Sequence, residues 1–201
     1  MSENEKHSEK MKRLKTSKQK IFSKKTEKKG LIIVNTGTGK GKSTAGFGMV
    51  FRAIAHGMPC AVVQFIKGAM ATGERTLIQK HFHELCEFHT LGDGFTWDTQ
   101  DKEKDIASAM KAWSKAKELI LDKEKKIILL DEINIALRYG YIEINDVVSF
   151  LLDQKPKMTH VILTGRNANE NLIHIADLVT DMTLVKHHFR NGVMSQAGIE
   201  F

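Results

Sequence analysis

The residues of this chain best suited to chemistry form a glycine-rich loop with two lysines, followed by two hydroxyl side chains. It reads VNTGTGKGKST over residues 34–44. Glycines allow backbone N–H groups to turn toward an anion, and the N-terminus of a following helix adds positive potential. Lys42 is placed to reach the terminal phosphates of a nucleotide, and the Ser43 hydroxyl to hold Mg²⁺. The loop predicts a nucleoside triphosphate site but does not indicate which bond of the nucleotide breaks.

This loop departs from the common phosphate-loop pattern at one position. The pattern has a glycine five residues before Gly41, whereas this chain has Thr36 there and Gly37 one place later. The alternative interpretation is a glycine-rich turn with lysines placed by chance. The flanking segments favour the phosphate site, because an apolar run at 31–34 precedes the loop and a helical pattern at 44–56 follows it.

Charged side chains follow two other apolar runs. Asp131 and Glu132 close the run KIILLDE at 126–132, where a strand end can deliver a carboxylate toward Mg²⁺. The alternative is that these carboxylates cap the next helix, and the sequence does not indicate which of them would face a metal. Arg166 follows the run at 160–165, where a fixed cation can neutralise phosphate charge, the alternative being an ordinary surface arginine.

Two aromatic residues stand out because they lie on a polar segment. Phe95 and Trp97 belong to GDGFTWDTQ at 92–100. Aromatic side chains on a loop often contact something flat and apolar, but they can equally anchor the loop itself, and their spacing does not decide between these. The nine histidines have no cysteine or carboxylate at ligand spacing, so we predict no zinc or iron site.

Short apolar runs alternate with helical patterns along the chain, which predicts the elements that position these residues. We expect strands at 31–34, 60–66, 85–88, 126–132, 160–165 and 178–186, and helices at 44–56, 73–83, 101–121, 144–152 and 169–176. This alternation is typical of an α/β fold with a mostly parallel sheet covered by helices on both faces, here in a single domain. In such sheets ligands bind at the carboxyl ends of the strands, where the motifs above fall.

The positive charge is confined to the N-terminus. Residues 1–29 carry the whole net charge of +7, and residues 30–201 are neutral overall. A nucleic-acid-binding fold usually spreads Lys and Arg over one face, so we predict no nucleic-acid partner. We therefore divide the chain into a basic, flexible arm (1–29) and a body (30–201). The arm is either disordered or a solvated helix, with a thin apolar stripe of Leu14, Ile21 and Phe22 that could fold on docking.

The remaining composition predicts a cytoplasmic protein. Cys60 and Cys86 lie in apolar runs without partner spacing, as expected of reduced core residues. No apolar segment is long enough to span a bilayer, and the charged N-terminus lacks the apolar stretch of a secretory signal. We expect no membrane association.

Several segments together resemble one family. VNTGTGKGKSTAGFG, VVQFIKG, GFTWDTQD, ILLDEIN, LTGRNA and the C-terminal QAGIEF occur in the order found in the P-loop ATP:corrinoid adenosyltransferases. The likeness runs from Gly30 to Phe201, and Thr36 matches the phosphate loop of that family. It implies a P-loop NTPase-like (RecA-like) fold. It also implies a homodimer, a reduced flavoprotein as electron donor, and a role in adenosylcobalamin biosynthesis or corrinoid salvage.

The resemblance also implies a reaction at carbon. Co(I) of a reduced corrinoid, cobalamin or its a,c-diamide precursor, would attack the 5′ carbon of ATP and release tripolyphosphate. Lys42 and Arg166 would be catalytic by stabilising the leaving group, Phe95 and Trp97 would contact the corrinoid, and Ser43, Asp131 and Glu132 would hold Mg²⁺. The residues expected to bind ATP are Asn35, Thr36, Gly37, Thr38, Gly39, Lys40, Gly41, Lys42, Ser43, Thr44 and Arg166.

Two other classes of function compete with this interpretation. The first is an ATP-driven nucleic-acid or regulatory NTPase that uses the basic arm. The second is a non-catalytic carrier that binds nucleotide and corrinoid without joining them. The products distinguish them, because an NTPase would release orthophosphate without any corrinoid.

Overall fold

A computed structural model describes residues 2–66, 72–91 and 101–200. Its centre is a six-stranded sheet in the order β3-β2-β4-β5-β1-β6, and every neighbouring pair is parallel. The strands are β1 (Ile32–Thr36), β2 (Cys60–Gln64), β3 (Cys86–Thr90), β4 (Ile127–Asp131), β5 (His160–Thr164) and β6 (Leu178–Asp181). All carboxyl ends therefore lie at one edge of the sheet, as the sequence predicted.

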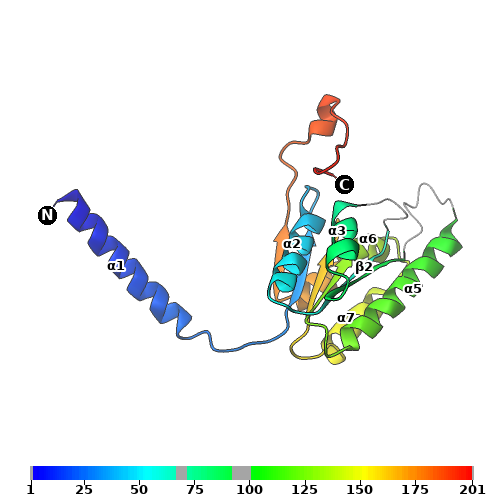
Figure 1. Ribbon diagram of the computed structural model, residues 1–201, viewed down its shortest axis with the longest axis horizontal. Coiled ribbons are helices and arrows are strands. Elements are labelled where there is room, and N and C mark those ends of the chain that lie inside the picture. The colour runs from blue at the N-terminus through cyan, green and yellow to red at the C-terminus, as the bar shows by residue number, and fades with distance from the viewer. Residues whose placement is uncertain (1, 67–71, 92–100, 201) are drawn as a thin grey trace.

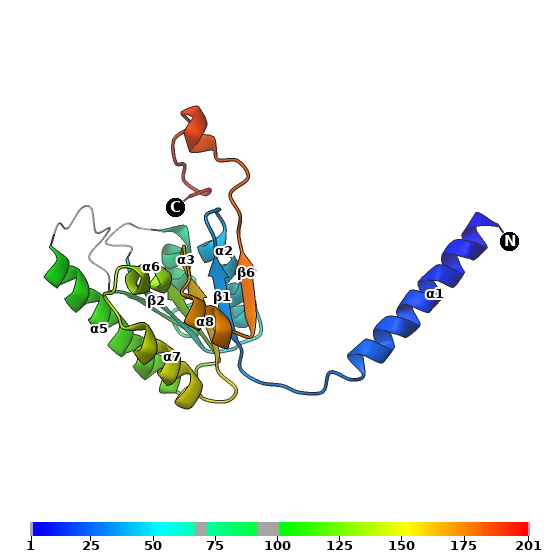
Figure 2. The ribbon, with the colours of Figure 1, turned by 180° about the vertical axis from the view of Figure 1, so that it is seen from behind.

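Helices cover both faces of this sheet (Figures 1 and 2). One face carries α2 (Lys42–Ala55) and α3 (Gly73–His81). The other carries α5 (Lys102–Leu121), α6 (Ile133–Arg138), α7 (Ile144–Asp153) and α8 (Glu170–Ile175). The predicted α/β fold is confirmed, and it is consistent with the P-loop NTPase-like architecture.

The core divides into two apolar layers, one on each side of the sheet, because successive strand residues point to opposite faces. In β1, Ile33 belongs to the layer beneath α2, whereas Ile32 and Val34 belong to the layer beneath α5. Strands β1, β2, β4 and β5 are buried on both faces, which explains their continuous apolar runs. In the second layer, Trp113 is fully buried and its ring meets Phe150 edge-on at 5.4 Å between centroids.

The N-terminal arm forms a separate helix, α1 (Glu3–Phe22), which stands away from the body at the end of an extended linker (Figures 1 and 2). Its start is stabilised locally, because the Ser2 and Glu5 side chains each accept a hydrogen bond from the other's backbone N–H. No residue of α1 is buried. Of the two alternatives for the arm, the structure shows the solvated helix, while the division into arm and body remains a prediction.

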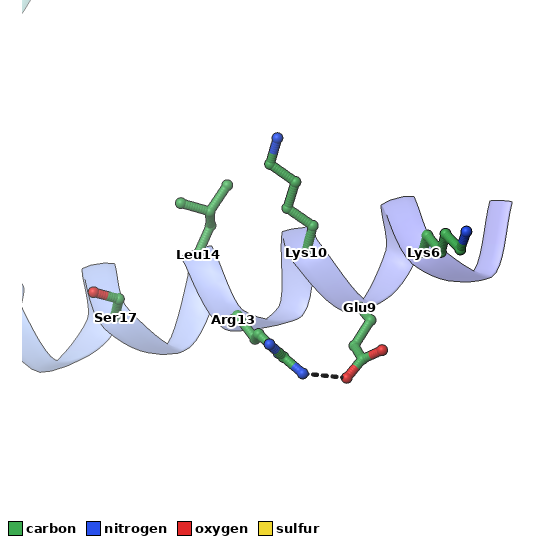
Figure 3. Close-up of a pocket in the computed structure, with 6 residues that line it drawn as sticks. All are labelled: Lys6, Glu9, Lys10, Arg13, Leu14 and Ser17. Atoms are coloured by element: carbon green, nitrogen blue, oxygen red, sulfur yellow. Dashed lines mark hydrogen bonds and ion pairs between the residues drawn. The ribbon is translucent and has the colours of Figure 1, made fainter. Parts of the chain in front are cut away.

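The surface of α1 carries a shallow hollow whose lining residues all belong to this one helix. Figure 3 shows that its lining comes from one helix and faces open solvent, with an Arg13–Glu9 ion pair of 2.6 Å beside it. The lining residues are Lys6, Glu9, Lys10, Arg13, Leu14 and Ser17. The hollow is therefore a surface feature of a single exposed helix and not an enclosed cavity.

Most element ends lie within two residues of the sequence prediction, and three differences stand out. Helix α2 begins at Lys42, two residues earlier than expected. Helix α6 was not predicted, since six residues are too few for a clear helical period. Strand β6 ends at Asp181 instead of 186, and a 3₁₀ turn, η1 (His188–Asn191), follows. In the part of the chain that the structure describes, no helix is long and apolar enough to cross a membrane.

Candidate active site

The glycine-rich loop joins β1 to α2 and has the backbone that its glycines allow. Gly37 and Gly41 have φ angles of 99° and 102°, values that side-chain-bearing residues rarely adopt. Gly41 is also the N-cap of α2, so no side chain caps the first amides of this helix. Those N–H groups, together with the helix dipole, are available to an anion. The structure thus provides the local geometry that a phosphate site requires.

Lys42 is the first residue of α2 and is 6% exposed. Its Nζ donates a hydrogen bond to the Gly39 carbonyl within the loop. Burial lowers the pKa of Lys42, the charge of Glu132 opposes this shift, and the positive charges of Arg166 and Lys40 add to it. A buried lysine among other cations gains stability when an anion arrives, which is the electrostatic preparation expected of a phosphate site.

Asp131 is fully buried at the end of β4, where side chains from the two adjacent strands hold it. Its Oδ2 accepts a hydrogen bond from Gln64 Nε2, and its Oδ1 accepts one from Thr164 Oγ1, each at 2.9 Å. Both carboxylate oxygens therefore have donors from the protein. Through these two hydrogen bonds Asp131 links β4 to β2 and β5 at the carboxyl edge of the sheet.

Glu132 follows Asp131 directly and is less buried. Its φ of 62° is a left-handed conformation, uncommon for a residue with a side chain. The Glu132 N–H donates to Thr164 Oγ1 at 3.0 Å, while its half-buried side chain acts electrostatically on Lys42. Glu132 is the N-cap of α6 but makes no side-chain capping bond. The helix-capping alternative is therefore not supported for Glu132.

The other predicted residues of the loop and of β5 lie around Lys42. Ser43 is half-buried in the first turn of α2, and Thr44 is exposed next to it. Arg166, two residues beyond β5, is exposed and close enough to Lys42 to lower its pKa. The sheet order explains this grouping, because β1 lies beside β5, which lies beside β4.

Hydrogen bonds fix the two ends of the loop. The Asn35 side-chain amide donates to the Lys42 carbonyl at 3.4 Å, and Thr36 Oγ1 accepts from the Ala168 N–H at 3.0 Å. Thr36, the residue that departs from the common pattern, is buried in β1 and joins this strand to the segment after β5. The departure thus has a structural role here.

The C-terminal segment lies against the loop, which the sequence analysis did not predict. Gly39 N–H donates to the Met182 carbonyl at 2.6 Å, and a Cβ on Gly37 would lie 2.3 Å from an Asp181 carboxylate oxygen. Lys40 forms an ion pair with Glu200, near the C-terminus. Glu200 lies within the QAGIEF segment. In the sequence this segment indicated the family resemblance, but it did not indicate that Glu200 lies beside the loop.

The two aromatic residues expected to contact the corrinoid, Phe95 and Trp97, lie outside the described residues. Their role therefore stays a prediction. The described site consists of the loop, the ends of β4 and β5, and the C-terminal segment.

Comparison with known proteins shows the family of this chain. The family model for ATP:corrinoid adenosyltransferase BtuR/CobO/CobP matches residues 28–201. A corrinoid adenosyltransferase of Sinorhizobium sp. is 67% identical over 195 residues, covering 97% of this chain and 91% of that protein. The corrinoid adenosyltransferases of Pseudomonas aeruginosa and Escherichia coli K12 are 45% and 39% identical, covering 98% of this chain and 96% and 98% of theirs. The chain therefore belongs to the ATP:corrinoid adenosyltransferase family.

Proposed function

We propose that this enzyme transfers the 5′-deoxyadenosyl group of ATP to the Co(I) centre of a reduced corrinoid and releases tripolyphosphate. The observation that carries the proposal is the grouping of Lys42, Lys40 and Arg166 around the open amides at the start of α2. Membership of the adenosyltransferase family supplies the acceptor class.

The electron pair needed for this transfer comes from the substrate. A lone pair of Co(I) attacks C5′, a cobalt–carbon bond forms, and the C5′–O5′ bond breaks with its electrons passing to the triphosphate oxygen. Cobalt is thereby oxidised formally from Co(I) to Co(III). Because Co(I) is already a strong nucleophile, the step requires no protein base.

The task left to the protein is to stabilise the leaving group. Tripolyphosphate carries about four negative charges, and preorganised cations lower the barrier as that charge develops. Lys42 is fixed in the loop by Gly39, so little reorganisation is needed when phosphate binds. Lys40 and Arg166 are more exposed and would close on the outer oxygens. Holding the nucleotide with C5′ facing the corrinoid contributes through orientation.

The donor set of the site fits Mg²⁺. Oxygen ligands are those this ion prefers. The Ser43 hydroxyl follows Lys42 in the first turn of α2, and the Glu132 carboxylate acts electrostatically on Lys42. Asp131 fits a supporting role better, because it is fully buried and Gln64 and Thr164 donate to both of its oxygens. Of the two carboxylates, we therefore assign Glu132 to the metal; when bound, Mg²⁺ would neutralise phosphate charge.

Four further features belong to the proposal. Phe95 and Trp97 form the corrinoid face, a reduced flavoprotein supplies electrons, the active form is a homodimer, and the enzyme works in the cytoplasm. The first three rest on the family likeness, and the cytoplasmic location rests on the composition. The choice between de novo synthesis and salvage depends on which corrinoid reacts faster.

An anaerobic assay tests the proposed reaction. The protein is mixed with ATP, Mg²⁺ and chemically prepared Co(I) corrinoid, while the absorbance change to the alkylated corrinoid is followed and the phosphate products are separated by ion exchange. We expect one tripolyphosphate per alkylated corrinoid and no ATP consumption without corrinoid. Orthophosphate release in the absence of corrinoid would contradict the proposal and favour an NTPase. Binding of both substrates without product would indicate a carrier.

A further inference from the structure

The chain beyond β6, residues 182–200 (here called the tail), returns to the phosphate loop. Figures 1 and 2 both show its end beside the turn between β1 and α2. Two hydrogen bonds connect the start of the tail to the loop: Gly39 N–H donates to the Met182 carbonyl at 2.6 Å, and Leu184 N–H donates to Thr38 Oγ1 at 3.4 Å. The tail is thus anchored beside the site at the point where β6 ends.

The far end of the tail contributes a carboxylate to the same loop. Glu200 pairs with Lys40, a residue 160 positions earlier in the chain. His188 Nε2 lies 3.2 Å from the second Glu200 oxygen, an ion-pair distance. The Glu200 side chain is 14% exposed and that of Lys40 is 53% exposed, so the carboxylate is enclosed while the lysine remains within reach of solvent.

The charges around Glu200 favour its ionised form. The pKa of Glu200 is lowered chiefly by its hydrogen bond from Lys40, which outweighs the opposing effect of burial. The carboxylate therefore carries a full negative charge at neutral pH, as an anion that competes with phosphate must.

We propose that Glu200 competes with the triphosphate for Lys40, and so sets the affinity for ATP and the ease with which tripolyphosphate leaves. This inference rests on the proposed function, since it assigns Lys40 to the leaving group. In the structure Lys40 is paired with Glu200. When ATP binds, Lys40 exchanges this single charge for the more highly charged triphosphate, and Glu200 is released.

The exchange matters most after the transfer. Tripolyphosphate gains charge when the C5′–O5′ bond breaks, so the group that stabilises the transition state also retains the product. Glu200 gives Lys40 another partner at that moment, so the product does not leave behind an unpaired cation. Because Lys40 remains partly exposed, we expect this ion pair to change a binding constant by about two- to fivefold.

A double-mutant cycle tests the competition in the full-length protein. Dissociation constants for inorganic tripolyphosphate and for ATP are measured by calorimetry at fixed Mg²⁺ in the wild type, Glu200→Gln, Lys40→Met and the double variant. Glu200→Gln keeps the shape of the side chain and removes its charge. The matched control is Glu118→Gln, which breaks an ion pair with Lys115 on α5, on the opposite side of the sheet from α2.

We expect Glu200→Gln to bind tripolyphosphate about two- to fivefold more tightly than the wild type. Glu118→Gln should bind as the wild type does, and Glu200→Gln should change nothing when Lys40 is already Met. Turnover at saturating substrate should fall in Glu200→Gln if tripolyphosphate release limits it. Thermal unfolding of each variant verifies that the fold persists.

Two results would overturn the proposal. In the first, Glu200→Gln binds tripolyphosphate no more tightly than the wild type. In the second, it tightens binding equally with and without Lys40, which would make the effect a general loss of negative charge. Failure of the proposed function would be seen separately, as the absence of adenosylated corrinoid in assays of the wild type. That result does not depend on the ratio of the tripolyphosphate dissociation constants of Glu200→Gln and the wild type.

Discussion

The phosphate loop and the N-terminal arm both contain lysines, but the structure uses these lysines in opposite ways. The arm holds the entire net charge of the protein and buries none of its residues in α1. The body is neutral overall, yet it encloses Lys42 at 6% exposure beside Lys40 and Arg166. The net charge of a segment therefore does not indicate whether it binds an anion. The burial and grouping of its charged side chains are the better indication.

The difference follows from the dielectric surroundings of each lysine. Around α1, water and salt screen every charge, so an ion pair such as Arg13–Glu9 contributes little. At the loop, burial lowers the pKa of Lys42, because its charged form has lost contact with water. An anion that binds there would stabilise the charged form. Three sets of substitutions test how buried and exposed positions of the chain differ, in order of decreasing effect.

The largest effect is expected from removing the buried lysine. Lys42→Ala should lower kcat/KM for cobalt–carbon bond formation by about 10²- to 10³-fold, because the developing triphosphate charge loses a preorganised cation. The matched control, Lys10→Ala in the arm, should change the rate by less than about threefold. Initial rates with prepared Co(I) corrinoid give both values, and circular dichroism checks the fold. Similar losses in the two variants would remove the contrast.

A smaller effect is expected from two glycines that differ in what surrounds them. In Gly37→Ala the new Cβ would meet Met182 backbone atoms at 2.6 Å in a left-handed conformation, which should lower the free energy of unfolding by about 2–4 kcal/mol. Gly48, within α2, has nothing within 4 Å of such a Cβ. Gly48→Ala should raise stability by about 0.5–1 kcal/mol. Urea unfolding measures both; a destabilised Gly48→Ala would contradict the open surroundings of that position.

The smallest effect concerns the joint between arm and body. His160 Nδ1 accepts a hydrogen bond from the Leu31 N–H at 3.1 Å, and burial together with the charge of Lys155 lowers the pKa of His160. The unfolded chain therefore binds a proton at higher pH than the native one. Stability should be complete above about pH 6.5 and decline as the pH falls from there toward the lowered native value.

His160→Asn keeps an acceptor near Nδ1 but cannot titrate. This variant should lose the pH-dependent part of the stability between pH 7 and 5, a change below about 1 kcal/mol, while its stability at pH 8 stays closer to that of the wild type. Urea unfolding at several pH values would reveal the difference. Identical pH profiles would show that His160 does not contribute to the acid sensitivity of the joint.

Much of the fold could be predicted because its strands are short, continuous apolar runs between helical patterns. Buried parallel strands have to read this way, and the left-handed turns of the loop require glycine. Helix α6 escaped prediction because its six residues make fewer than two turns. The end of β6 escaped because its residues are all exposed, so no apolar pattern marks where pairing stops.

The site was predictable only where local sequence determines it. The loop, Asp131, Glu132 and Arg166 each follow an apolar run, so parallel topology brings them to one edge. Gln64 and Thr164 were missed as partners of Asp131, because only the register of three strands brings them together. Glu200 was missed for the same reason at longer range, since nothing local signals a contact across 160 positions.

The left-handed backbone of Glu132 has a consequence for how freely this position can vary. Its φ of 62° would be relieved by glycine, and asparagine would tolerate it better than glutamate does. Either replacement would shorten or delete the side chain that acts electrostatically on Lys42. A relaxed backbone at this corner is therefore available only by giving up or withdrawing that negative charge.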